Sequence, residues 1–312
     1  MVEITYRTFQ GRLLLRPGEA LNRLLVGVLA KALSLYPGRV GLVGIVVLSN
    51  HLHLLLKVED QHALSKLMEY FGGNAAREVN RLHDWAGSLW GGRYTSICVT
   101  TEERAQVARL EYLLAQGVKE GLVAKVSDWP GIHFGKTLLE GRSLISGEWI
   151  DRTRLYRATR RGKQLERSQY VEELTVELQP LPCWSHLPWG EYIRRIEEIV
   201  ERIEARAALE RDLAGAEVLG AEAVEARDPH HRPGKIERRP APVVHGATKR
   251  ERRRWQEAYG FFLDAYRAAA KRLREGEGDV KFPEGCFPPG LPYVWPGCEG
   301  TAGAEPAPAE PV

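Results

Sequence analysis

The sequence lacks several features that would place it in a special class. Its four cysteines, Cys98, Cys183, Cys286 and Cys298, form no CxxC pair and no set of short spacings. This argues against a disulfide framework or a cysteine zinc site and favours reduced thiols. No apolar run approaches the ~20 residues that span a bilayer, and the first residues lack the charged-then-apolar order of a signal peptide. We therefore expect a cytoplasmic protein with no membrane partner.

A strong excess of charge of one sign is also absent. The chain has 44 Lys and Arg against 41 Asp and Glu, a formal net charge of +3 over 312 residues. This mild excess permits a nucleic-acid partner but does not by itself predict one. A hydrophobic fraction of 44% is typical of a globular protein with a real core, and the length favours two domains.

The first half of the chain alternates between strand and helix patterns. Apolar runs and period-two patterns predict strands over 2–15 (one strand or a pair), 40–48, 51–58 and 93–99, and helical spacing predicts helices over 19–35, 63–82 and 102–116. This order is typical of an α+β fold in which helices cover an antiparallel sheet, as in ferredoxin-like proteins.

The character of the sequence changes after about residue 145. We expect a catalytic domain over 1–145, a basic and proline-containing connector over 146–187, a mainly helical region over 188–299, and a disordered tail over 300–312. The helical region includes long helical patterns over 192–213 and 248–275. Its role is not predicted by any motif.

Two histidines share one face of the predicted strand over 51–58. Residues two apart on a strand point to the same side, so His51 and His53 present two imidazoles together. Imidazole is a common ligand of divalent metals, although an isolated His-x-His pair is weak evidence. Residues four apart on a helix also share a face, so Tyr112 and Gln116 point together. A helix packed beside the histidine strand would place the Gln116 amide oxygen near a metal. An aromatic residue at Tyr112 could equally be a half-buried packing residue.

The motifs resemble those of a known family. Leu48-Ser-Asn-His-Leu-His-Leu-Leu-Leu56 is similar to the His-hydrophobic-His (HUH) motif of single-tyrosine insertion-sequence transposases and REP-associated tyrosine transposases. Ser88-Leu-Trp-Gly-Gly-Arg-Tyr94, the segment from Tyr112 to Val123, and Asp128-Trp-Pro130 resemble further blocks of that family. The order and spacing match over residues 1 to about 140. This chain has Gln116-Gly117 where relatives commonly have Asn-Pro, and Gln remains a competent oxygen ligand.

The resemblance implies a metal-dependent DNA transposase of the HUH endonuclease fold. His51, His53 and Gln116 would bind a divalent ion, Mg²⁺ or Mn²⁺, and Tyr112 would be the nucleophile. The substrate would be single-stranded DNA with a hairpin at an element end or repeat. A tyrosine hydroxyl has an unperturbed pKa of ~10, so a nearby cation is needed to favour the phenolate. The product would be a 5′-phosphotyrosine and a free 3′-OH. Relatives include monomers and homodimers that exchange the tyrosine helix, and the sequence leaves both states open.

Basic and aromatic residues around these motifs are candidate DNA contacts. The candidates are Arg77, Arg81, Arg93, Tyr94, Lys119, Arg252 and Arg253. Arginines bind phosphates and aromatic rings stack on unpaired bases, although charged helix faces are often only solvated.

Two other functions fit parts of the pattern. A histidine-triad nucleotide hydrolase has three alternating histidines on its strand, but here the third place is Leu55. A domesticated DNA-binding or regulatory protein of the same fold, without cleavage activity, is the second alternative. The presence of all four site residues argues against it.

Overall fold

The main sheet has the strand order of a ferredoxin-like fold. A computed structural model describes residues 1–161, 166–234 and 241–290. Its sheet consists of β1 (Val2–Arg7), β2 (Val40–Leu48), β3 (His51–Val58), β4 (Thr95–Val99) and β7 (Val244–His245), in the order β2-β3-β1-β4-β7. Neighbouring strands among β2, β3, β1 and β4 are antiparallel, and β7 joins the edge parallel to β4. The predicted fold class is confirmed.

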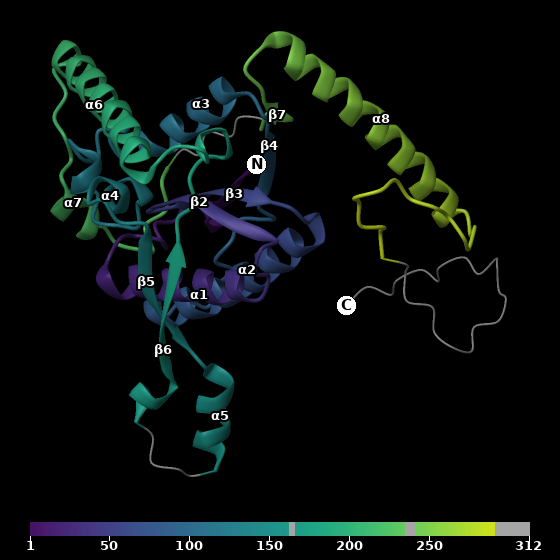
Figure 1. The fold of residues 1–312 in the computed structure, drawn as a ribbon. Helices are drawn as coiled ribbons and strands as arrows, with labels where there is room; N and C mark the ends of the chain where they lie inside the picture. The colour runs from purple at the N-terminus through teal and green to yellow at the C-terminus, as the bar shows by residue number, and fades with distance from the viewer. Residues whose placement is uncertain (162–165, 235–240, 291–312) are drawn as a thin grey trace. The chain divides into compact units, whose positions relative to one another are not determined.

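Helices cover both faces of this sheet (Figure 1). Helices α1 (Glu19–Ser34) and α2 (Gln61–His83) lie on one face, and Gly72 of α2 packs against the ring of Tyr6. Helices α3 (Glu103–Leu114), α4 (Phe134–Leu139) and α6 (Trp189–Ala214) lie on the other face and pack against one another or against β2. Successive residues of a strand point to opposite faces, and Tyr6 points toward α2. Thr5 of β1 and its partner on β3 therefore face the α3 side, as does every second residue from them.

The predicted helix at 102–116 is slightly shorter than expected, because α3 ends at Leu114. Other predicted bounds hold closely. Strands β2 and β3 begin and end at the predicted residues, and α1 ends one residue early. The predicted strand region 2–15 contains only β1, which is followed by a short 3-10 turn at Phe9–Gly11.

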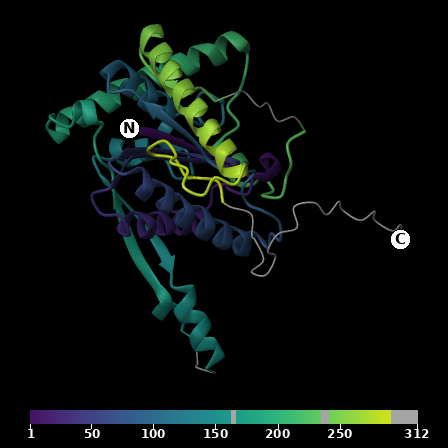
Figure 2. The ribbon, with the colours of Figure 1, turned by 90° about the vertical axis from the view of Figure 1, so that its right-hand side faces the viewer.

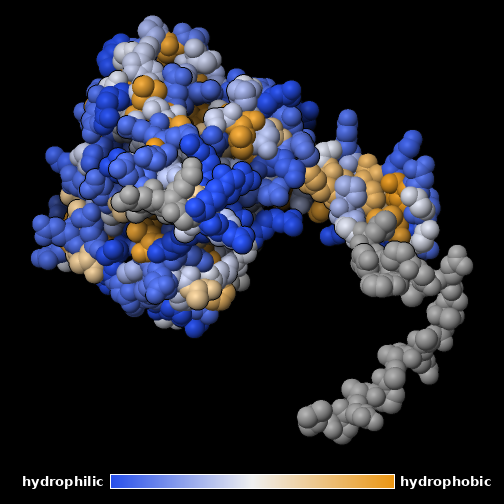
Figure 3. Space-filling view, turned by 90° about the horizontal axis from the view of Figure 1, so that it is seen from below, coloured by the Kyte–Doolittle hydropathy of each residue, from blue (hydrophilic) through white to orange (hydrophobic). Residues whose placement is uncertain are grey.

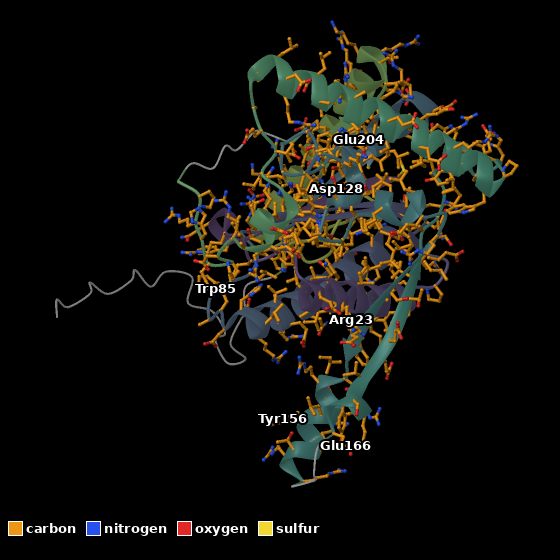
Figure 4. The ribbon with its side chains drawn as sticks, turned by 90° about the vertical axis from the view of Figure 1, so that its left-hand side faces the viewer. Arg23, Trp85, Asp128, Tyr156, Glu166 and Glu204 are labelled. Carbon is orange, nitrogen blue, oxygen red and sulfur yellow. The ribbon has the colours of Figure 1, made fainter. Side chains whose placement is uncertain are left out.

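A two-stranded hairpin forms in the region expected to be a connector. Strands β5 (Leu144–Ile150) and β6 (Val171–Glu177) pair antiparallel, with α5 (Arg152–Arg160) following β5. The hairpin extends away from the main sheet (Figures 1 and 2), and Tyr156 and Glu166 lie at its far end (Figure 4). Strand β5 packs tightly on α1. A Cβ added at Gly27 of α1 would overlap the backbone carbonyl of Glu148 in β5.

The chain divides into two compact units, Met1–Ala258 and Tyr259–Val312. The first unit also contains α7 (Ala221–Glu225) and the start of α8 (Lys249–Arg274). On its face in Figure 3, hydrophobic side chains form small separate patches among hydrophilic ones, as is usual for a folded surface. In the second unit, the Tyr266 ring packs edge-on against Phe282, with 5.5 Å between ring centroids. The predicted tail over 300–312 lies outside the described residues.

Candidate functional site

The sheet register brings the two histidines together on the face covered by α3. His53 lies between Thr5 of β1 and Val46 of β2, and His51 lies between Arg7 and Leu48. The two imidazole centroids are 5.0 Å apart with nearly perpendicular rings. His53 is buried and His51 is partly buried. The predicted placement of both imidazoles on one side of a strand is therefore observed.

Each imidazole is oriented through its Nδ1 atom. The His51 Nδ1 donates to Asn50 Oδ1 at 2.7 Å, and the His53 Nδ1 donates to Glu3 Oε1 at 2.9 Å. Because Nδ1 carries the hydrogen, Nε2 of each ring is left as the lone-pair nitrogen. Burial lowers the pKa of His51 well below its ordinary value and also lowers the pKa of His53. Both rings are thus neutral near pH 7, the form that binds metal ions.

One nitrogen of this pair has no hydrogen-bond partner within the described part of the chain. His53 Nε2 is buried and unpaired, and a buried polar atom without a partner costs free energy. A metal ligand whose other nitrogen donates to a carboxylate is a common arrangement in metalloproteins. The two histidines and their supports therefore fit a divalent ion bound at the Nε2 atoms.

Gln116 lies just beyond the end of α3. Its side chain is buried, and its Nε2 donates to the carbonyl of Tyr112 at 3.2 Å, which leaves Oε1 as the amide's acceptor. Buried His133 interacts with the backbone of this turn at Leu113, Leu114 and Gln116. His133 is also bridged to Val46, the residue that pairs with His53. These contacts connect the Gln116 turn to β2, the strand that pairs with the histidine strand β3.

Across the described residues, no group of three or more His, Cys, Asp and Glu side chains could hold a metal ion. An amide oxygen, such as that of Gln116, is a ligand of another residue type.

Tyr112 packs against His53. Its ring meets the His53 ring edge-on, with 5.8 Å between centroids, and the side chain is 39% exposed. Two cations lie against the same ring: Arg109 Cζ and Lys119 Nζ are each 3.6 Å from its centroid. Cations this close attract a phosphate. Tyr112 is thus accessible to a substrate and surrounded by positive charge.

Glu3 connects these parts through one buried carboxylate. Besides His53, it contacts Arg109, with Nε 2.9 Å from Oε2, and His245, with Nε2 2.8 Å from Oε2. Burial alone would raise the pKa of Glu3, but hydrogen bonds from His245 and His53 and the charge of Arg109 lower it to about 2. The carboxylate is therefore ionised under ordinary conditions. It links a candidate metal ligand, the tyrosine helix and strand β7.

Glu3, Arg109 and His245 are not among the site residues predicted from the sequence. Glu3 gave one usable signal, since it is a charged residue between the apolar residues Val2 and Ile4 of a predicted strand. Arg109 lies one helical turn before Tyr112, a spacing that also suggests contact. His245 gave no signal, because it lies in a short strand far along the chain.

The candidate DNA contacts are distributed over different parts of the first unit. Lys119 lies at Tyr112, as described above. Arg77 and Arg81 lie on α2, on the opposite face of the sheet, and are hydrogen-bonded to Asn74 and Glu78 respectively.

The remaining candidates differ in their surroundings. Arg93 is exposed just before β4, and the adjacent Tyr94 packs edge-on against Tyr6. Arg252 lines a cavity beside α3, whereas Arg253 pairs with Glu257 at 2.9 Å. The structure therefore brings together His51, His53, Tyr112 and Lys119, and the Gln116 side chain contacts the backbone carbonyl of Tyr112. Arg252 lines the same cavity as Arg109.

Comparison with known proteins gives a family for the segment that holds this site. A family model described as "Transposase IS200 like" matches residues 37–115. This segment matches the IS200-like transposases. The match contains both histidines and Tyr112, confirms the resemblance predicted from the sequence, and supports a transposase function with DNA as the partner.

Comparisons of the whole chain with solved structures and with curated proteins identify no relative that supports a functional argument. A crystal structure of a candidate transposase from Deinococcus radiodurans R1 is 22% identical, covers 35% of this chain and 85% of its own, and superposes with a TM-score of 0.26. Values this low establish no shared mechanism. No curated protein gave a significant match. Among the described residues of this transposase-like chain, no helix is long and apolar enough to cross a membrane.

Proposed function

We propose that the transposase-like unit cuts and rejoins single-stranded DNA through a covalent link between Tyr112 and a 5′-phosphate. The observation that carries the proposal is the position of Tyr112, which packs over His53 with a cation on each side of its ring. A hydroxyl in this position can reach a phosphate held at the same cations. The substrate expected from the family resemblance is a strand with a hairpin at an element end or repeat.

The residues that would hold a divalent ion are His51, His53 and Gln116. Such an ion, Mg²⁺ or Mn²⁺, would polarise the attacked phosphoryl group and offset its negative charge. Asn50 and Glu3 orient the two imidazoles through Nδ1, so that Nε2 of each is available to a ligand. The buried Gln116 amide is held at the end of α3 by its bond to Tyr112.

The chemical step conserves the phosphodiester. The Tyr112 oxygen attacks the scissile phosphorus and loses its proton to solvent, and Arg109 and Lys119 stabilise the negative charge that develops on the oxygen. The bond from phosphorus to the 3′-oxygen of the leaving strand breaks, and that oxygen takes up a proton. One ester bond replaces another, so a second DNA 3′-OH can reverse the attack and reseal the strand without ATP.

The test is formation of a covalent adduct. The full chain is incubated with Mn²⁺ and end-labelled single-stranded DNA carrying hairpins from its own genomic flanks, and a denaturation-resistant protein–DNA band is expected. Tyr112→Phe keeps the ring and its packing but lacks the nucleophile, so the band should disappear. Tyr156→Phe is the matched control, since Tyr156 is 60% exposed at the far end of the hairpin and should keep the band.

Two outcomes would contradict the proposal. An adduct that persists in Tyr112→Phe would show that another residue is the nucleophile. DNA binding by the wild-type chain without an adduct on any flanking strand would instead favour a DNA-binding protein that does not cleave.

A further inference from the structure

A basic pocket lies beside the tyrosine helix, next to the site described above. It has a volume of about 410 Å³, within the size range of small-ligand sites. One wall is the first part of α3, including Arg104 and Arg109, and the other is the segment from Pro242 to Arg252, including His245. The second wall lies outside the residues that match the transposase family. Strand β7 holds it in place, because Val244 and His245 pair with β4.

The lining of this pocket is positive. It contains three arginines and a histidine and no acidic side chain, and its remaining residues are small or apolar. Arg109 and His245 pair with Glu3, which is not among the lining residues, so the uncompensated positive charge comes from Arg104 and Arg252. Within the described ranges, Arg104 and Arg252 are exposed and have no acidic partner, although they come from segments far apart in the sequence. Unpaired arginines that converge on one cavity repel each other, so an anion bound between them would be stabilising.

The pocket is contiguous with the proposed nucleophile. Arg109 lines the pocket, and its guanidinium carbon is also 3.6 Å from the centroid of the Tyr112 ring. Since Arg109 and Tyr112 are three residues apart on α3, they occupy neighbouring turns of the same helix face. A strand whose scissile phosphate lies at Tyr112 can therefore extend along α3 to the pocket.

We propose that this pocket binds a phosphodiester group of the DNA strand close to the one attacked by Tyr112. Arginine is suited to this ligand, because its planar donors match phosphate oxygens and remain charged. The inference rests on the proposed function for the identity of the strand. It assigns a role to the segment 242–252, which holds the strand in place while α3 supplies the nucleophile.

The experiment measures strand binding in the absence of cleavage. All variants are made in the Tyr112→Phe chain, and their affinity for fluorescein-labelled oligothymidylate is measured by fluorescence anisotropy over a range of salt concentrations. Each phosphate contact contributes about 0.7 to the slope of log affinity against log salt for single strands. Arg252→Ala and Arg104→Ala each remove one charge, one from each wall of the pocket. Neither residue lies in β7, so the strand that holds the second wall is unchanged.

The matched control is Arg253→Ala. Arg253 is the next residue along α8, but it pairs with Glu257 and does not line the pocket. We expect Arg252→Ala and Arg104→Ala each to lose about tenfold in affinity at low salt and about 0.7 in slope. Arg253→Ala should change both by much less, although its formal charge change is the same.

Equal losses in all three variants would overturn the proposal, because they would show a general charge effect. A loss confined to one of Arg104 and Arg252 would also overturn it, since the two walls would then not share a ligand. The adduct test separates these failures from failure of the proposed function. If the wild-type chain forms the adduct but all variants have the same salt slope, the pocket proposal alone is rejected. If the slopes of the pocket variants differ from that of Arg253→Ala but no adduct forms, the cleavage reaction alone is rejected.

Discussion

Replacement of Glu3 by glutamine is the most direct test of how the site is held together. Glu3→Gln keeps the shape of the side chain but removes the negative charge that faces His53, Arg109 and His245. Arg109 would then be left largely buried without its counter-charge. Breaking a buried ion pair in this way is strongly destabilising, whereas a change at the surface is not.

The size of the effect follows from the pKa of Glu3. This pKa falls from its ordinary 4.5 to about 2 in the folded protein. At about 1.4 kcal/mol for each pH unit, the charged carboxylate contributes about 3 kcal/mol to the free energy of unfolding. Because the folded value is the lower one, this stability is fully present above pH 4.5 and is lost as the pH falls toward 2. Loss of the His53 support should also weaken Mn²⁺ binding by about 10-fold to 100-fold.

Two measurements check this prediction. Urea denaturation of the metal-free protein, at neutral pH and at steps down to acid, gives the free energy of unfolding, and calorimetric titration gives the affinity for Mn²⁺. Glu59→Gln is the control, because Glu59 pairs with Lys57 at the surface with its side chain 57% exposed. If Glu3→Gln stayed within about 0.5 kcal/mol of the wild type and bound Mn²⁺ equally well, the role assigned to this carboxylate would be wrong.

Three further predictions concern packing, pH and metal. Gly27→Ala should lower the free energy of unfolding by about 2 kcal/mol or more in urea titrations, because its Cβ would overlap the backbone of Glu148. Gly73→Ala is the control: its Cβ would meet open space on a helix, so the free energy of unfolding should rise by roughly 0.5–1 kcal/mol. Equal effects of the two substitutions would contradict the packing argument. Burial lowers the pKa of His133 from 6.5 to about 4, so as the pH falls the unfolded chain binds a proton here before the folded chain does. The free energy of unfolding should therefore decrease as the pH drops from 6.5 toward 4. His133→Asn should flatten this part of the plot of unfolding free energy against pH, and an unchanged plot would refute the assignment. Chelation of divalent ions should abolish the Tyr112 adduct, and added Mn²⁺ should restore it; an adduct formed in excess chelator would exclude a metal-dependent reaction.

Local sequence patterns predicted strands β2 and β3 well because both contain long apolar runs. Strands β2 and β3 are buried over nearly their whole length, so the run of Val, Leu and Ile marks their ends. Strands β5 and β6 were not predicted, because half or more of their residues are exposed or partly exposed and the pattern is interrupted. Their pairing also joins segments separated by α5, a contact that no local pattern reports.

The candidate site shows the same division. The spacing of His51, His53 and Tyr112 within single elements was enough to predict which side chains share a face. The buried carboxylate that connects them could not be predicted in this way, because Glu3 and His245 meet only after β7 has joined β4. Spacing reports neighbours on one element, and contacts across the sheet depend on register.

Glu3 contacts His245, which lies far along the chain, and this has a consequence during protein synthesis. A nascent chain leaves the ribosome from its N-terminus, so His51, His53 and Tyr112 emerge well before strand β7. Until His245 has been made, one neighbour of the central carboxylate and one wall of the pocket are missing. On the proposed function, a chain that ends before β7 should therefore form less of the Tyr112 adduct than the full chain.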